Sequence, residues 1–379
     1  MTGRIVCTSM LVVFFAISGS ATGLTDSLKP GKADLKSAGA LAFGPEGILF
    51  VGDWLSAVIY AIDTEDRTPS FGSINIKGID SKIAGMLGTT ADNMLINDIA
   101  VNPLSGKVYV SVSRSRGPEG VPVILRIDSR GTMEQLSMAN IKHSRVALEN
   151  APENRPNPRE AGPGLTRQLE WVVPKPTQNR RLQVFMDILY SDGRLYISGM
   201  SNEEFASKLR SVAFPFTKAD NGASIEIYHA SHGRFETEAP IRTFVPYKID
   251  GAPHFLASYG CTPLVKIPVS SLKPNSKVVG TTIAELGSGN VPMDMVVYTK
   301  GGKDYLLMAS NFRGLLKIDL SDVGKYPALT SPVPETAGLP HEEIKQVTGV
   351  AHLEKLDDRN AIVLTMANNS YDLRTIALP

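Results

Sequence analysis

The chain has 379 residues, of which 42% are hydrophobic, 20% charged and 7% aromatic, enough apolar side chains to bury a large core. Its 39 basic and 38 acidic residues give a net charge of +1 and form no long block of one sign. This pattern excludes the basic stripe typical of nucleic-acid-binding proteins and the acidic tail that would attract a basic partner.

The N-terminal segment has the features of a secretory signal peptide, predicted over residues 1–23. Arg4 precedes an apolar run at residues 5–17, and small residues follow at 18–23. The run is too short for a membrane span, and no later segment reaches the ~18 apolar residues that a span requires. We expect cleavage after Ala21 or Gly23, a mature domain without a membrane span, and a periplasmic or secreted location. An uncleaved anchor is the alternative.

A repeated unit of short strands runs through the rest of the chain. Each copy has three or four runs rich in β-branched and aromatic residues, separated by Gly, Pro, Asn and Asp turn residues. The unit recurs at five starts, near Ala40, Asp98, Asp187, Asp294 and Gly349. A weaker copy at residues 241–268 fits the long gap after the third start. No segment shows convincing helical periodicity.

These copies predict an all-β fold, a six-bladed β-propeller with four-stranded blades, formed by residues 24–379 as a single domain. A repeat of about 40–60 residues with four strands is typical of propeller blades. Five or seven blades are the alternatives. The last copy ends after its third strand, so we expect an N-terminal strand, near residues 32–35, to pair with the last blade and close the ring.

Residues 143–178 form an insertion in the repeat, between the second and third predicted blades. This stretch contains six prolines and few apolar residues. A loop of this length in a compact domain is usually either functional or disordered, and both interpretations stay open.

The repeat resembles that of six-bladed propellers of the NHL and regucalcin/gluconolactonase type, in the phrases at residues 43–53 (FGPEGILFVGD) and 100–110 (AVNPLSGKVYV). The resemblance covers most of the chain and concerns the fold more than the activity. In gluconolactonase-like enzymes, acidic and amide side chains hold a divalent ion in the central channel. The residues at similar places here are Asn97, Asp98, Asp187 and Asp294. The family's first ligand, a Glu, has no match, because residues 37–39 are Ser-Ala-Gly.

Three blades begin with an Asp inside a common phrase, at Asp98, Asp187 and Asp294. Propeller topology brings such starts to one mouth of the channel, where carboxylates repel unless a cation or a proton relieves them. One interpretation is a Ca²⁺ site, completed by Asn97, that polarises an ester or lactone carbonyl. The other is architectural, with each carboxylate accepting backbone N–H bonds from an adjacent loop.

The turns after the second strand of each blade should face the same mouth. Aromatic, amide and charged side chains around such a funnel suit a polar ligand, whereas ordinary turn chemistry is the alternative. The candidate ligand-binding residues are Asp53, Trp54, Asn202, Tyr259, Asn311, Phe312 and Arg313.

Other chemistry-bearing residues are few. With Cys7 inside the signal peptide, Cys261 is the only cysteine of the mature chain, and we expect a packed thiol rather than a nucleophile. His229 and His232 should face opposite sides of a strand, which argues against shared metal ligation. His352 is expected to be a satisfied core histidine.

Three functions follow from these patterns. The first is an exported propeller that binds a small polar molecule or another exported protein. The second is a Ca²⁺-assisted ester or lactone hydrolase, with Asp187 and His143 as candidate catalytic residues. The third is a non-catalytic subunit of an exported redox complex. The sequence offers no cofactor-attachment residues for the third function. Binding is preferred over hydrolysis because the acidic ligand of the gluconolactonase-like enzymes is missing, and the choice between an enzyme and a binding protein stays open.

Overall fold

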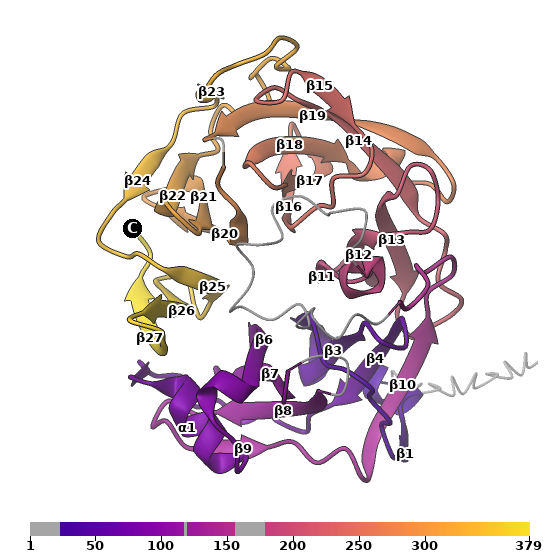
Figure 1. The fold of residues 1–379 in the computed structure, drawn as a ribbon, viewed down its shortest axis with the longest axis vertical. Helices are drawn as coiled ribbons and strands as arrows, with labels where there is room; N and C mark the ends of the chain where they lie inside the picture. Colours follow the sequence, from indigo (N-terminus) through magenta and orange to yellow (C-terminus); the bar gives the residue numbers. More distant parts are fainter. Residues whose placement is uncertain (1–22, 117–119, 156–178, 288) are drawn as a thin grey trace, which may run out of the picture.

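The computed structural model describes residues 23–116, 120–155, 179–287 and 289–379. Their strands form antiparallel sheets arranged around a common centre (Figure 1), which we name blades 1 to 6 in the chain order of their innermost strands. One parallel pair, between the outer strands of blades 3 and 4, joins these two blades. The predicted all-β propeller is therefore confirmed. Residues 1–22 of the predicted signal peptide and residues 156–178 of the predicted insertion lie outside the described residues.

Each blade contains four main strands. From the centre outward, blade 1 has β2 (Leu41–Phe43), β3 (Ile48–Asp53), β4 (Val58–Asp63) and β10 (Ile141–Ala147), with β1 (Lys29–Gly31) added outside. In the same direction, blade 2 has β6 (Met94–Val101), β7 (Val108–Arg114), β8 (Val121–Ile127) and β9 (Met133–Gln135). Blade 3 has β11 (Asp187–Ser191), β12 (Arg194–Met200), β13 (Ser207–Ala213) and β14 (Ala223–His229), with β15 (Arg234–Glu236) paired to β14.

The remaining blades follow the same plan. Blade 4 has β16 (Thr243–Ile249), β17 (Ala252–Ser258), β18 (Pro263–Pro268) and β19 (Lys277–Leu286), with β23 (Thr336–Gly338) outside. Blade 5 has β20 (Pro292–Lys300), β21 (Lys303–Ser310), β22 (Gly314–Asp319) and β24 (Glu342–Ile344). Blade 6 has β25 (Val350–Lys355), β26 (Asn360–Ala367), β27 (Ser370–Ala377) and β5 (Asn75–Ile76).

The turn between β2 and β3 shows how the local sequence builds a blade. Pro45 starts a short 3₁₀ turn, and Gly47 ends it at φ +72°, a left-handed conformation that suits glycine. The apolar run of β3 that follows is buried along its whole length. A strand that is buried on both faces needs such a continuous apolar run.

The blades do not follow one another around the ring in chain order. Contacts between inner strands run β6, β2, β11, β16, β20, β25 and back to β6, so blade 1 lies between blades 2 and 3 (Figure 1). The hydrophobic clusters of the described residues give the same order, because each cluster joins two neighbouring blades. One cluster contains Tyr60 of blade 1 and Tyr109 of blade 2. A second contains Phe50 of blade 1 and Ile197 of blade 3, and a third contains Ile99 of blade 2 and Leu364 of blade 6.

Ring closure differs from the prediction. The outermost strand of blade 6 is β5, which pairs with β27, and not an N-terminal segment near residues 32–35. The N-terminal β1 instead pairs with β10 on the outside of blade 1. The reason is the ring order: blade 2 is the neighbour of blade 6, so the segment leading into blade 2 passes the edge of β27 and fills it.

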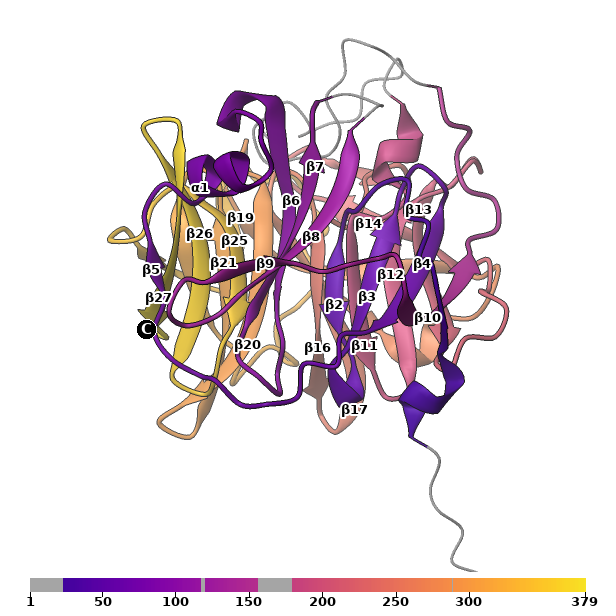
Figure 2. The same cartoon turned by 90° about the horizontal axis from the view of Figure 1, so that it is seen from below.

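The predicted insertion starts later than expected, because residues 143–147 belong to β10 and pair with β4. Helical structure was also missed. Among the described residues, α1 (Ile79–Met86) packs beside β27 with Ile79, Ile83 and Ala84 buried, and Figure 2 shows it at one end of the strands. The 3₁₀ turns are η1 (Leu24–Ser27), η2 (Pro45–Gly47), η3 (Ala91–Asn93), η5 (Arg180–Gln183) and η6 (Val269–Ser271). None of the described helices has the length and apolarity to cross a membrane.

Candidate functional site

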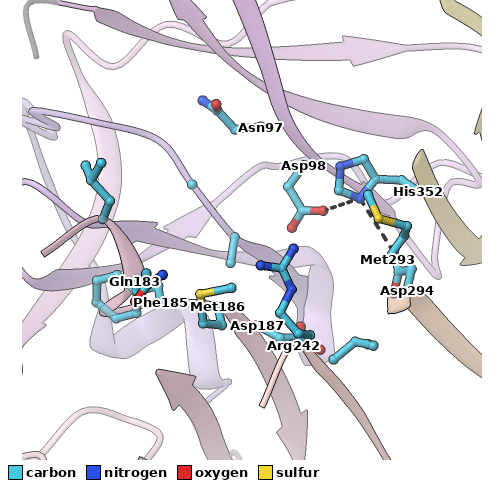
Figure 3. Close-up of a pocket in the computed structure, with 14 residues that line it drawn as sticks. Asn97, Asp98, Gln183, Phe185, Met186, Asp187, Arg242, Met293, Asp294 and His352 are labelled. Carbon is cyan, nitrogen blue, oxygen red and sulfur yellow. Dashed lines mark ion pairs between the residues drawn. The ribbon is translucent and has the colours of Figure 1, made fainter. Parts of the chain in front are cut away.

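The inner strands and η5 surround a central cavity. Its walls include Asp98, Asp187, Asp294 and His352 from four inner strands and Gln183 from η5 (Figure 3). The space open to the centres of water molecules measures ≈ 80 Å³. One water needs roughly 10–15 Å³ by this measure, so the cavity has room for several waters or one small molecule.

Three of these wall residues follow irregularities in their strands. The pairing register shifts between Ile96 and Asp98, between Pro292 and Asp294, and between Val350 and His352. Each shift places an extra residue directly before the cavity residue. Such β-bulges bend a strand and redirect its side chains, which is why they are frequent beside functional sites.

The three aspartates join the inner strands of neighbouring blades. Their carboxylates accept hydrogen bonds from the backbone N–H groups of Leu41 (2.7 Å, to Asp98), Phe244 (3.0 Å, to Asp187) and Leu353 (3.2 Å, to Asp294). In the ring order these aspartates lie on every second blade, and each accepts its bond from the inner strand of the blade that follows. The architectural role considered for them is therefore present, although the donors are inner strands rather than loops.

His352 lies between two of the carboxylates and is only 6% exposed. Its Nδ1 is 3.1 Å from Oδ1 of Asp98 and 3.7 Å from Oδ2 of Asp294 (Figure 3). His352 is therefore a buried histidine held by two carboxylates, at the wall of the cavity rather than enclosed in an apolar core. One ligand atom from each of Asp98, Asp294 and His352 lies within 4.8 Å of the others, close enough to hold a cation.

The predicted metal ligands are thus only partly brought together. Asp187 lines the cavity but is not part of this group of three. Nδ2 of Asn97 donates to the carbonyl of Ala38 (2.7 Å) and the hydroxyl of Ser113 (2.9 Å), while its buried Oδ1 has no described partner. The group of Asp98, Asp294 and His352 contains a nitrogen donor, and its two carboxylates already accept backbone N–H bonds. This donor set fits Ca²⁺ poorly, because Ca²⁺ takes six to eight oxygens.

Burial and mutual repulsion favour protonation of this acidic cluster. Burial, reinforced by the charge of Asp294, raises the pKa of Asp98 from 3.8 to about 7 despite the opposing charge of His352. Burial and the charges of Asp294 and Asp98 raise the pKa of Asp187 well above 3.8, and the pKa of Glu354 on β25 rises for the same reasons. Burial lowers the pKa of His352, but its interactions with Asp294 and Asp98 outweigh this and raise it.

Arg242 adds a positive charge to the same cavity. It precedes β16, and burial lowers the pKa of its guanidinium to about 10, with no described carboxylate contributing to the shift. No hydrogen bond or ion pair joins its guanidinium to a described residue. The residue is only partly buried, so its unpaired charge can be met by solvent or by an anionic group that enters the cavity.

Buried polar atoms without a hydrogen-bond partner occur at the cavity as well as elsewhere among the described residues. At the cavity they include both side-chain atoms of Gln183 and Oδ1 of Asn97. Both residues line the cavity. Gly199 on β12 lets the Gln183 segment approach, since a Cβ there would lie 2.1 Å from the carbonyl oxygen of Val184.

The predicted ligand-binding residues do not gather at this cavity; none of the seven lines it. The Asp53 carboxylate accepts four bonds, from the N–H groups of Lys36, Ser37 and Ser56 and from the Ser37 hydroxyl. Trp54 and Tyr259 are buried in the core.

The remaining candidates lie elsewhere on the surface or in structural contacts. Asn202 is exposed, and Phe312 is 70% exposed. Asn311 accepts a bond from the N–H of Val291, and Arg313 forms an ion pair with Glu343. The catalytic candidate His143 lies on β10, an outer strand of blade 1, where its Nδ1 is 3.0 Å from the carbonyl of Ile141.

Sequence reasoning missed Arg242, Gln183 and the role of His352 in the cavity wall. A signal existed for Arg242, which stands alone among apolar residues at the start of a run expected to be buried (Ile-Arg-Thr-Phe-Val). Gln183 carried no such signal, since η5 reaches the cavity only through the packing of blades 1 and 3.

Comparisons with known proteins assign no family. No protein-family model matches the chain, and no curated protein matches it. Similar solved structures include a PQQ-bound aldose sugar dehydrogenase from Streptomyces coelicolor (12% identity, 93% of this chain and 97% of that chain, TM-score 0.30). A second is a putative oxidoreductase (glucose dehydrogenase) from Thermus thermophilus, at 15% identity over 92% of this chain and 100% of that chain, with a TM-score of 0.34. A third is hydrazine synthase from Kuenenia stuttgartiensis, at 11% identity over 96% of this chain and 99% of that chain, with a TM-score of 0.34. These values are too low to assign an activity or to identify this chain with the NHL or regucalcin type.

Proposed function

We propose that the protein binds a small polar molecule with an anionic group in its central cavity. The observation that carries this proposal is the guanidinium of Arg242, which has no hydrogen-bond or ion-pair partner among the described residues, beside the buried, unsatisfied polar atoms of Gln183 and Asn97. Buried polar atoms in native proteins almost always have partners, so a group of exceptions around one cavity needs an explanation. A bound ligand would satisfy them together.

The chemistry of the wall defines the ligand class. Arg242 would pair with a carboxylate or phosphate, because a guanidinium presents N–H donors that match either anion. The amides of Gln183 and Asn97 offer donors and acceptors to hydroxyl groups. Hydroxy-carboxylates and small sugar acids combine both features and match the size of the cavity.

This function is preferred over Ca²⁺-assisted hydrolysis for a chemical reason. The carboxylates that the hydrolase needs as ligands already accept backbone N–H bonds from neighbouring blades. The third residue close enough to share an ion with Asp98 and Asp294 is His352, a nitrogen donor, whereas Ca²⁺ prefers oxygen ligands. We therefore derive no catalytic step through a calcium ion.

The test is a screen of hydroxy-carboxylates, sugar acids and their neutral alcohols by thermal shift, followed by calorimetry on any hit. Arg242→Met should weaken binding of an acidic hit by about 10–100-fold, since a hydrogen bond to a charged group contributes about 1.5–3 kcal/mol. The matched control is Arg126→Met, which removes an arginine on β8 that pairs with Glu134. Equal loss in both variants, or binding of the neutral alcohols only, would contradict the proposal.

A further inference from the structure

A second group of metal-ligating side chains lies at the outer edge of blades 3 and 4. His229 ends β14, His232 lies in the turn before β15, and Cys261 lies in the turn between β17 and β18. One ligand atom from each lies within 4.8 Å of the others, and the two imidazole centroids are 3.9 Å apart. The sequence expectation that the histidines face opposite sides is wrong, because the chain turns directly after His229 and brings His232 back beside it.

Glu236 fixes the orientation of both rings. Its two carboxylate oxygens lie 2.8 Å from Nδ1 of His229 and 2.7 Å from Nδ1 of His232. A carboxylate that holds Nδ1–H of an imidazole leaves Nε2 as an acceptor, which is how metal-binding histidines are usually oriented.

An independent observation points to a missing ligand. His229 is only 2% exposed, and its Nε2 has no hydrogen-bond partner among the described residues. Oε2 of Glu285 is likewise buried without a described partner, while its Oε1 accepts the N–H groups of Ala230 and Ser231 in the same turn. The buried, unpartnered Nε2 of His229 is therefore an acceptor for which the described residues supply no partner.

We propose that His229, His232 and Cys261 bind a transition metal ion of the Zn²⁺ type, with Glu236 as the carboxylate that orients both histidines. Two imidazoles and a thiolate form the nitrogen and sulfur donor set that Zn²⁺ prefers over Ca²⁺ or Mg²⁺. Three protein ligands leave a fourth position for water or an exchangeable ligand. The adjoining cavity, with ≈ 320 Å³ open to water centres, supplies the space for that ligand.

This site and the central cavity share one residue, since Arg242 lines both. The metal proposal does not depend on the proposed function, because none of its ligands belongs to the wall of the central cavity. The two proposals therefore succeed or fail separately.

The test uses Co²⁺ as a spectroscopic substitute for Zn²⁺. In a Cys7→Ser background, Cys261 is the only thiol of the chain. Stoichiometric Co²⁺ should then produce an intense near-ultraviolet charge-transfer band from the thiolate and visible bands of four-coordinate cobalt, both removed by added Zn²⁺. Cobalt held by Asp98, Asp294 and His352 would give no thiolate band, so the signal is specific to this site.

Variants identify the ligands. Cys261→Ser should abolish the thiolate band, and His232→Gln, at an exposed position that does not threaten folding, should weaken binding at least tenfold. Glu236→Gln should weaken it about 10–100-fold, the usual effect of removing a carboxylate that orients a metal-binding histidine. His254→Gln on β17, whose Nδ1 is 2.9 Å from the carbonyl of Ala252, is the matched control and should bind normally.

A folded, reduced protein that shows no thiolate band at saturating Co²⁺, or a band unchanged in both His232→Gln and Glu236→Gln, would overturn the proposal.

Discussion

The carboxylate of Asp294 accepts a hydrogen bond from the backbone N–H of Leu353, 3.2 Å away, and so joins the inner strands of blades 5 and 6. Asp98 and Asp187 make the same bond to blades 1 and 4. The propeller is therefore fastened at every second boundary between blades by a side chain that also forms the wall of the central cavity. This double use makes the architecture and the site dependent on the same residues.

We expect Asp294→Ala to be less stable than Asp294→Asn by about 1–3 kcal/mol in chemical denaturation. Both variants remove the negative charge, but asparagine keeps one of the two oxygens that accept the N–H groups of Leu353 and Met295, whereas alanine keeps neither, and a buried unsatisfied donor costs about that amount. The asparagine variant is thus the control for the loss of charge. Equal stability of the two variants would show that the bond to Leu353 contributes nothing.

We expect part of the stability to fall as the pH rises from about 4 to about 7. In this range Asp98, whose pKa is raised from 3.8 to about 7, is protonated in the folded chain and ionised in the unfolded chain. The folded state then binds more protons, so raising the pH disfavours it. His352, with a raised pKa, acts in the same direction, since its stabilising charge is lost as the pH passes its folded pKa.

Asp98→Asn should flatten this dependence, measured as the unfolding free energy at several pH values between about 4 and about 8. Comparing the slope with that of the parent protein removes the contribution of groups that do not interact with Asp98, while Asp187, Glu354 and His352 respond together with it. An unchanged slope would mean that Asp98 does not take up a proton on folding.

We expect Arg242→Met to raise the unfolding free energy of the ligand-free protein by up to about 1 kcal/mol while it weakens ligand binding. The reason is that the partly buried guanidinium has no hydrogen-bond or ion-pair partner among the described residues, whereas a methionine of similar length needs none. Arg126→Met should instead be neutral or slightly destabilising, because that arginine pairs with Glu134. A clear loss of stability in Arg242→Met would indicate a structural role for the guanidinium.

We expect Gly199→Ala to destabilise the protein strongly and Gly85→Ala to stabilise it slightly. A Cβ at Gly199 would lie 2.1 Å from the Val184 carbonyl oxygen, so the segment that carries Gln183 must move. Gly85 lies within α1 with no atom within 4 Å of the added carbon, and alanine there should gain about 0.5–1 kcal/mol. Thermal unfolding of both variants measures the difference, and an unaffected Gly199→Ala protein would contradict the described packing of η5.

We expect cysteines at positions 61 and 144 to form an intramolecular disulfide in a background without Cys7 and Cys261. Ala61 and Ser144 are partners in the pairing of β4 with β10. Partners in antiparallel strands have Cα atoms about 4.5–5.5 Å apart, within the range of a disulfide. Faster migration on a non-reducing gel, absent in each single-cysteine variant, would verify that β10 completes blade 1. No crosslink under oxidising conditions would contradict the ring order.

The strands themselves could be predicted because their signal is local. The apolar runs at residues 48–53 and 58–63 predict two neighbouring strands, and they are β3 and β4. Their turn residues and continuous apolar runs need no knowledge of the rest of the chain, since both reflect backbone preference and burial on two faces. The Asp phrases also marked the inner strands of blades 2, 3 and 5 correctly.

The order of the blades could not be predicted in the same way. The strand β5 is only two residues long, yet it completes a blade whose other strands lie near the end of the chain. Beside it, the N–H of Ile74 donates to the hydroxyl of Thr375, which is 301 positions away in the sequence. So short a segment carries no pattern of its own, and its partner is selected by which edge lies beside it in space. The β-bulges before Asp98, Asp294 and His352 are likewise properties of a strand pair rather than of one strand.

The amino-acid sequence by itself therefore determined the all-β propeller and the inner position of the three aspartates, because hydrophobic pattern and turn chemistry act over a few residues. Tertiary structure alone decided which side chains share a cavity. Ring order, strand register and one turn after β14 bring Arg242 and Gln183 beside His352, and His232 beside His229. Those contacts result from packing between distant segments, where the free energy of burying whole blade faces outweighs any local preference.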